Sequence, residues 1–107
     1  MKFETFTRGN RTFYPVFLAG FHDSIAPSGV VFLRESDAEE YCKDKVVHVK
    51  PYLFRNQEDA ESFVKSRARA EVNHCNSLGF DICRAVRSAQ CEQFKQEVIK
   101  VINEQSK

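Results

Sequence analysis

The pattern of apolar and polar residues predicts two extended segments at the start of the chain, residues 2–7 and 11–18. Gly9 and Asn10 lie between them, a dipeptide that suits the two-residue type II′ turn of a tight β-hairpin. Apolar side chains occupy both alternating sets of the second segment, which predicts a strand that is buried on both faces or leaves one apolar face exposed. Pro15 has no N–H to donate, so we expect its nitrogen to face a sheet edge or a bulge. The two sets are Phe13, Pro15 and Phe17, and Tyr14, Val16 and Leu18.

One sequence motif occurs twice, as FLRESDAEEYCK at Phe32–Lys43 and as LFRNQEDAESFVK at Leu53–Lys65. Each copy has two apolar residues, an arginine, a polar break, Asp-Ala-Glu and then an aromatic residue two places on. The motif predicts a strand that leads into a helix, used twice. In the first copy Ser36 is the expected N-cap, with Glu39 three residues later completing a capping box. In the second copy Asn56 is the expected N-cap, and acidic residues follow it where the helix dipole favours them.

Two further short segments, residues 30–33 and 46–49, are rich in β-branched residues and predict strands. We expect Pro51 to interrupt the second of these strands, with residues 52–54 continuing in an extended conformation. An eleven-residue segment, residues 19–29, shows no periodicity and predicts a long loop.

The C-terminal half of the chain has a helical pattern. Apolar residues between Ala60 and Cys75 recur at spacings of three and four, and Gly79 suits the C′ position that ends such a helix. Asp81 can cap a following helix, so the two helices form an αα-hairpin. The apolar face of the last helix turns by roughly 100–140° along its length, so either the helix breaks near Ser88 or its two halves pack against different partners.

These elements predict an α+β fold in a single domain, residues 1–107. Its centre is a small, mostly antiparallel sheet of three or four strands, drawn from residues 2–18, 30–34 and 46–54. A short helix and the C-terminal αα-hairpin are expected to pack on one side of that sheet.

The composition is that of an ordinary globular domain. The 107 residues are 42% hydrophobic and 29% charged, with a net charge of +1, which argues against disorder and against membrane insertion. No apolar run approaches the roughly 18 residues that a membrane helix needs. A secretory signal needs a basic start followed by an apolar stretch, whereas Met1-Lys2-Phe3-Glu4 is followed by polar residues and Arg8, so we expect a cytoplasmic protein.

The residue types that carry catalysis and metal binding lack the spacing that these functions need. The four cysteines include no pair at the short spacing of a structural zinc site, so we expect no metal. No glycine-rich phosphate motif occurs, and His22, Asp23 and Ser24 are adjacent rather than brought together from distant segments, so neither a cofactor nor a catalytic residue is expected. One candidate for a thiol-dependent enzyme remains in Cys83, beside Arg84 near a helix start, against the alternative of reduced and mostly buried thiols. The cysteines are Cys42, Cys75, Cys83 and Cys91, and pairing of Cys75 with Cys83 across the hairpin is left open.

Basic residues cluster in the predicted αα-hairpin, and they suggest a nucleic-acid-binding regulator as the second function. A phosphate-binding stripe would form if their side chains converge. The alternative is that they are the solvated face of two amphipathic helices, since the first three do not all point one way. The residues concerned are Lys65, Arg67, Arg69, Arg84 and Arg87.

The function that the sequence favours is a non-enzymatic binding protein that docks on a protein partner. Inhibitors and adaptors are often small domains of this kind, including those encoded by phages and mobile elements. The candidate contact residues are Tyr14 on the hairpin and Phe21, His22 and Asp23 in the long loop, because long loops are often functional. A homodimer through the C-terminal helix or the N-terminal hairpin is a further possibility.

Overall fold

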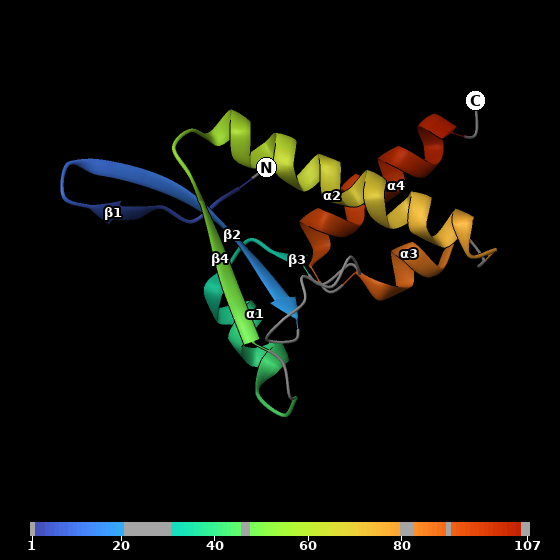
Figure 1. The fold of residues 1–107 in the computed structure, drawn as a ribbon, viewed down its shortest axis with the longest axis horizontal. Coiled ribbons are helices and arrows are strands. Elements are labelled where there is room, and N and C mark those ends of the chain that lie inside the picture. Colours follow the sequence, from blue (N-terminus) through green and yellow to red (C-terminus); the bar gives the residue numbers. More distant parts are fainter. Residues whose placement is uncertain (1, 21–30, 46–47, 80–82, 90, 106–107) are drawn as a thin grey trace.

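The computed structural model describes residues 2–20, 31–45, 48–79, 83–89 and 91–105, which together form an α+β fold (Figure 1). This confirms the predicted fold class, with a small antiparallel sheet of four strands and its helices. In chain order the elements are β1 (Phe6–Arg8), β2 (Arg11–Gly20), β3 (Val31–Phe32), α1 (Glu35–Cys42), β4 (His48–Phe54), α2 (Gln57–Ser77), α3 (Cys83–Ser88) and α4 (Glu92–Gln105).

The strand β2 is the centre of the sheet and pairs antiparallel with the other three strands. Phe17 and Leu18 each pair with both β3 and β4, so these two strands lie on opposite edges of β2. Toward the start of β2, a hairpin with β1 is closed by the pair Arg8↔Arg11. In the turn of this hairpin, Gly9 has a φ of 63° and Asn10 does not have a positive φ. This agrees with the predicted type II′ turn, which needs a positive φ at its first central residue only.

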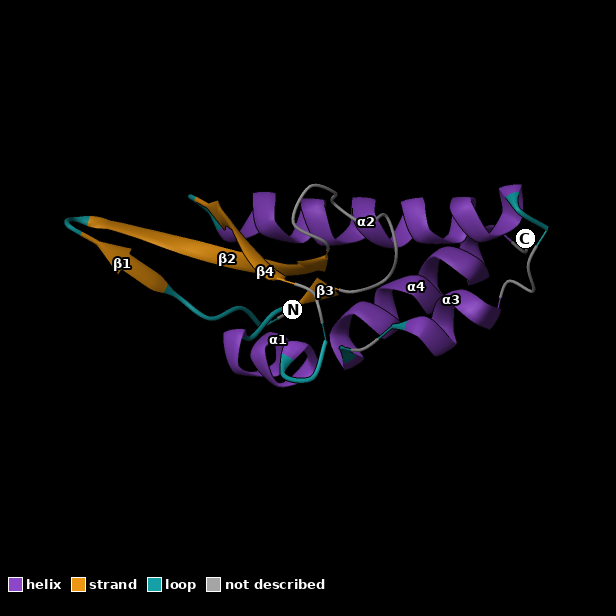
Figure 2. Cartoon of the chain, turned by 60° about the horizontal axis from the view of Figure 1, so that its bottom comes forward, coloured by secondary structure: helices purple, strands orange, loops and turns teal. Residues whose placement is uncertain are grey.

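Both faces of β2 are buried, which confirms one of the two alternatives that its sequence left open. Val16 and Leu18 lie in a core shared with α2, α3 and α4, whereas Phe17 and Ala19 lie in a second core under α1. Figure 2 shows α1 and α2 on opposite sides of the sheet. The prediction that the helices pack on one side only is therefore wrong, because the second apolar face of β2 needs its own cover.

The repeated motif forms a strand followed by a helix in both copies, as predicted. Ala38 and Ala60, at equivalent positions of α1 and α2, are both 0% exposed, but they lie in the two different cores. The aromatic pairs also correspond. The ring centroids of Phe32 and Tyr41 are 5.5 Å apart, and those of Phe54 and Phe63 are 5.1 Å apart. The two copies thus place one helix on each face of the sheet.

The caps of these two helices differ. Asn56 caps α2 as predicted, since its side chain accepts a hydrogen bond from the backbone N–H of Asp59 at 2.8 Å. The predicted capping box in the first copy is wrong, because α1 begins one residue before Ser36, and the extended N-cap residue is Arg34, whose side chain makes no capping hydrogen bond. Serine at a position that is already helical cannot act as the N-cap.

The strand β4 runs through Pro51 without interruption, contrary to the sequence prediction. The pairs Pro15↔Leu53 and Phe17↔Pro51 are two residues apart in the ladder. Alternate residues of an antiparallel strand point their N–H groups away from the partner strand, so a proline there removes no ladder hydrogen bond. On the other edge of β2, the ladder with β1 ends at Phe13 and that with β3 starts at Phe17, so Pro15 faces an unpaired interval, as expected.

The helices α2, α3 and α4 form the layer on the second face of the sheet. Gly79, with a φ of 71°, follows the C-cap residue Leu78, which agrees with the predicted end of α2. The last helix breaks after Ser88, which confirms the first of the two alternatives for its change of phase. The off-phase residues Phe94 and Val98 are 0% exposed inside the core, so the chain itself covers the face that was considered for a homodimer. The predicted cap Asp81 lies outside the described residues.

Candidate interaction site

The face of the sheet under α1 is covered only in part. Because α1 begins at Glu35 and runs toward the Ala19 end of β2, none of the described helices lies over the part of the ladder around Pro15 and Leu53 on this face. A cleft of about 200 Å³ lies there, and we call it the sheet cleft. It is lined by Glu4, Thr5, Phe6, Pro15, Phe17, Glu35, Pro51 and Leu53.

The floor of the sheet cleft is apolar and comes from alternate residues of β2 and β4. Pro15 and Phe17 are buried beneath it, while Leu53 at its margin is 43% exposed. Phe6 forms one wall and is 46% exposed, with its ring centroid 6.5 Å from that of Phe13. Leu53 and Phe6 are two of the three large hydrophobic residues that are exposed in the described part of the chain. Both line the same cavity, which a scattered pair of surface residues would not.

The N-terminal segment forms the wall of the sheet cleft and is held at both ends. At one end the Lys2 backbone N–H donates to Gln93 Oε1 at 2.8 Å, and Gln93 Nε2 donates back to the Lys2 carbonyl at 3.4 Å. Toward the other end, Glu4 Oε1 accepts a hydrogen bond from the backbone N–H of Glu35 at 2.6 Å, after which the chain enters β1. The wall is thus preformed, so a ligand would not lose free energy in ordering it.

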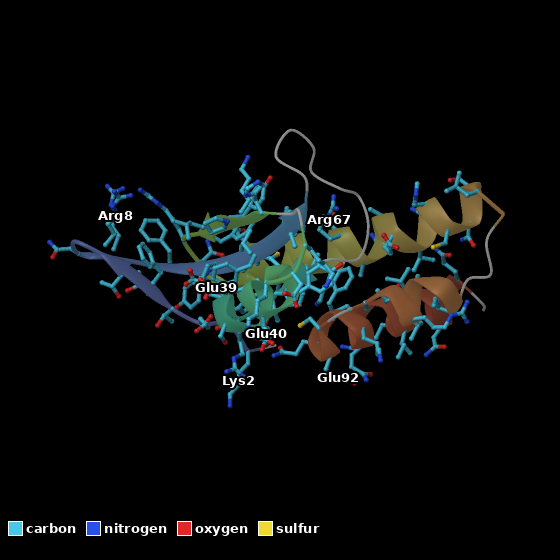
Figure 3. The ribbon with its side chains drawn as sticks, turned by 90° about the horizontal axis from the view of Figure 1, so that it is seen from below. Lys2, Arg8, Glu39, Glu40, Arg67 and Glu92 are labelled. Carbon is cyan, nitrogen blue, oxygen red and sulfur yellow. The ribbon has the colours of Figure 1, made fainter. Side chains whose placement is uncertain are left out.

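One end of the sheet cleft is acidic. Glu4 and Glu35 line it, and α1 carries further carboxylates and no base between Glu35 and Cys42. Asp37 Oδ2 lies 3.9 Å from Arg34 Nε in an exposed ion pair. Figure 3 shows Glu39 and Glu40 on α1, with Arg8 far from them on the hairpin. The cleft therefore combines an apolar floor with a negative end.

The predicted contact residue Tyr14 is not part of the sheet cleft. It pairs with Phe54 in the ladder and packs, half-buried, against the core on the opposite face of the sheet. The other predicted contact residues Phe21, His22 and Asp23 lie outside the described residues.

The basic residues of the second hypothesis lie on different sides of their helices. Lys65 and Arg69 are exposed one turn apart on α2, and Arg69 Nη2 lies 4.0 Å from Glu104 Oε2 of α4. Arg67 is half-buried and points away from α4 (Figure 3). Arg87 is exposed on α3, while the side chain of Arg84 lies outside the described part. The Glu104 carboxylate offsets part of the charge of Arg69, and Arg67 lies on a different side of α2 from Arg69. Both observations argue against a single phosphate-binding stripe.

The described thiols are reduced and lie in apolar surroundings. Cys75 is buried, and Cys42 and Cys91 are half-buried. Burial raises the pKa of the Cys42 thiol, and the nearby Lys45 ammonium opposes this rise. A raised pKa lowers the thiolate fraction, which is the nucleophilic form. The side chain of Cys83, the predicted candidate for a reactive thiol, lies outside the described residues.

The described part of the chain holds neither a cluster of metal ligands nor a helix suited to span a membrane. No three His, Cys, Asp or Glu side chains of that part come together as a metal site. None of its helices combines the length and the apolar character needed to cross a membrane.

The residues that line the sheet cleft were not singled out by the sequence. The sequence pattern predicts Leu53 as part of a strand, Phe6 as part of a hairpin, and Glu35 as a residue before a helix. Two features of the sequence indicate the cleft. Pro51 and Leu53 alternate with inward-facing residues, and the helix that begins at Glu35 is too short to cover the whole ladder.

Comparison of the chain with protein-family models, with curated proteins and with solved structures finds no match. The function therefore rests on the chemistry of the site.

Proposed function

We propose that this chain is a non-enzymatic binding protein, an inhibitor or adaptor, that docks on a protein partner through the sheet cleft. The observation that carries the proposal is the uncovered part of the sheet, where Phe6 and Leu53 are each nearly half exposed beside a preformed cavity. Exposed apolar patches next to polar rims are typical of protein interaction sites.

The size of the cleft supports a protein partner over a small-molecule substrate. Pockets for cofactors and drug-sized ligands usually enclose about 300–1,000 Å³. The sheet cleft has about 200 Å³, which suits one or two side chains of a partner. Its lining of phenylalanine, proline and leucine supplies packing area rather than groups for acid–base or nucleophilic chemistry.

A pair of exposed leucines allows a matched experiment. Leu53 lies in the sheet cleft and Leu78 lies at the far end of α2, where it is 52% exposed. The wild-type chain, Leu53→Gln and Leu78→Gln are each used to capture proteins from a native lysate of the source cells, with and without nuclease. We expect a protein that is retained by the wild type and by Leu78→Gln, lost with Leu53→Gln, and unaffected by nuclease.

The purified partner then binds the wild-type chain directly in a titration, and Leu53→Gln weakens this binding by about tenfold or more. Equal retention by Leu53→Gln would show that the cleft is not the docking site. Loss of every captured protein after nuclease treatment would favour the nucleic-acid hypothesis instead.

A further inference from the structure

We propose that the partner segment bound in the sheet cleft is a basic one, with a lysine or arginine placed next to an apolar anchor residue. This inference rests on the proposed function and adds the chemistry of the partner. The apolar anchor would contact Phe6, Pro51 and Leu53, and the cation would lie against Glu4 and Glu35 at the acidic end.

The arrangement of carboxylates on α1 carries the charge argument. Glu35 and Glu39 are one helical turn apart, so their negative charges lie on the same side of α1 and repel each other. Within the described part of the chain, neither forms an ion pair at 4.0 Å or less; the ion pair on this helix joins Arg34 and Asp37. A partner cation between Glu4 and Glu35 would relieve this repulsion.

The position of Glu4 strengthens the argument, because it concentrates charge at the cleft. Its Oε1 accepts the hydrogen bond from the Glu35 N–H, which holds the Glu4 carboxylate beside the first turn of α1. The helix dipole stabilises a carboxylate at this position, and the Glu35 side chain adds a second one at the same end of the cavity. A partner rich in phosphate or carboxylate groups would be repelled there.

The edge of β4 determines how the partner segment is held. Strand addition to an exposed edge needs a row of backbone N–H and C=O groups. Pro51 lies in the middle of β4 and offers no N–H, and Lys50 beside it is exposed. Proline and lysine are residues that protect an edge strand against added strands. The partner is therefore recognised by side chains that enter the cleft rather than by extension of the sheet.

The experiment selects peptides from a displayed random library, each about twelve residues long, with the full-length protein as bait. The charge variant is Glu4→Gln/Glu35→Gln, which removes both charges but keeps an oxygen acceptor for the cap of α1. Its control is Glu58→Gln/Glu104→Gln, which removes two exposed charges on α2 and α4, away from the sheet cleft. Leu53→Gln and Leu78→Gln serve as the cleft variant and its control.

We expect the wild type to enrich peptides with an apolar residue next to lysine or arginine. A selected peptide should bind Glu4→Gln/Glu35→Gln about tenfold more weakly and Glu58→Gln/Glu104→Gln with little change, and the tenfold difference should shrink in high salt. If both charge variants select the same peptides as the wild type while Leu53→Gln selects none, the proposed cation is wrong and the docking cleft stands. If the wild type enriches nothing that Leu53→Gln does not also enrich, the proposed function itself fails.

A second copy of the chain is the competing occupant of the cleft, through the N-terminal hairpin. Sedimentation of the wild type, Leu53→Gln and Leu78→Gln separates the two cases. A monomer in all three variants agrees with a separate partner. A dimer that is lost in Leu53→Gln and kept in Leu78→Gln would overturn the proposal, because the cleft would then be filled by the protein itself.

Discussion

The Glu4 carboxylate caps a helix that begins at Glu35, far along the chain: its Oε1 accepts a hydrogen bond from the Glu35 N–H at 2.6 Å. The N-cap residue of α1 is Arg34, which has no side-chain acceptor to offer to the first turn. The cap therefore comes from the N-terminal segment, and the same contact forms one wall of the sheet cleft. One hydrogen bond therefore contributes both to the stability of α1 and to the shape of the candidate site.

Two replacements of Glu4 distinguish the contribution of its hydrogen bond to stability from the contribution of its charge. Glu4→Ala removes the acceptor, and we expect the free energy of unfolding to fall by about 1 kcal/mol, the usual value of a helix cap. Glu4→Gln keeps an oxygen acceptor and should retain most of that stability. Urea denaturation of both variants gives the comparison, with Glu40→Gln as an exposed control on α1. Equal losses for Glu4→Ala and Glu4→Gln would show that the charge, not the hydrogen bond, matters.

The second copy of the motif suggests how α1 could gain a cap from its own N-cap residue. Arg34 and Asn56 are the equivalent N-cap residues, and both are extended, with φ and ψ of −130° and 131° for Arg34 and −138° and 156° for Asn56. Arg34→Asn should therefore supply a cap from within the helix. This cap would accept from the N3 N–H, as Asn56 does from Asp59, whereas Glu4 accepts from the N–H of Glu35, so Glu4→Ala should cost about as much in that background as in the wild type. A double-mutant cycle by urea denaturation measures this, and strong coupling would show that the two caps serve the same N–H group.

The elements that sequence reasoning predicted correctly are those whose signals are local. The motif at Phe32–Lys43 and Leu53–Lys65 has an inward-facing alanine, an aromatic residue and acidic first-turn residues within a few positions. Asn56 and Gly79 act on backbone groups within a few residues of themselves. The assignment of Ser36 as a cap failed although the signal was present: aligning the two Asp-Ala-Glu sequences places Arg34, not Ser36, opposite Asn56.

The sheet cleft could not be predicted in this way because it depends on contacts between distant segments. Glu4 contacts a residue 31 positions away, and Lys2 contacts Gln93, 91 positions away. Periodicity shows that β2 has two apolar faces, but not where a short helix stops covering one of them. The absence of cover over Leu53 follows from the length and direction of α1 in space.

Two phenylalanines should differ strongly in their contribution to stability. Phe94 is 0% exposed in the core between the sheet and the helices, so Phe94→Ala leaves a cavity and should cost about 3–5 kcal/mol. Phe6→Ala removes a ring that is 46% exposed and should cost about 1 kcal/mol or less. Urea denaturation of both variants gives the comparison. Similar losses would indicate that Phe6 has a structural role beyond forming a wall of the cleft.

The end of α2 depends on the backbone of Gly79. Its φ of 71° lies in the left-handed region, and a Cβ placed there meets no atom within 4 Å. Gly79→Ala should thus lower the free energy of unfolding only through backbone strain, by about 1–2 kcal/mol. Gly79→Asn should cost less, since asparagine tolerates this conformation better. Thermal and urea denaturation of both variants provide the measurement, and a stabilised Gly79→Ala would refute the assigned C′ role.

The thiol of Cys42 should make stability depend on alkaline pH. Burial raises its pKa in the folded chain above the ordinary value of 9.0, with Lys45 acting in the opposite direction. The folded state thus holds the thiol proton more tightly than the unfolded state does. The resulting stabilisation is complete below the unfolded pKa and is lost as the pH rises through the folded pKa.

Comparison with Cys42→Ala isolates this effect, because alanine has no proton to lose. The stability of the wild type relative to Cys42→Ala should be constant near about pH 7 and should decline toward about pH 10. Urea denaturation at a series of pH values measures the difference. A difference that grows with pH would mean that the folded chain favours the thiolate, and it would make Cys42 a candidate nucleophile beside Cys83.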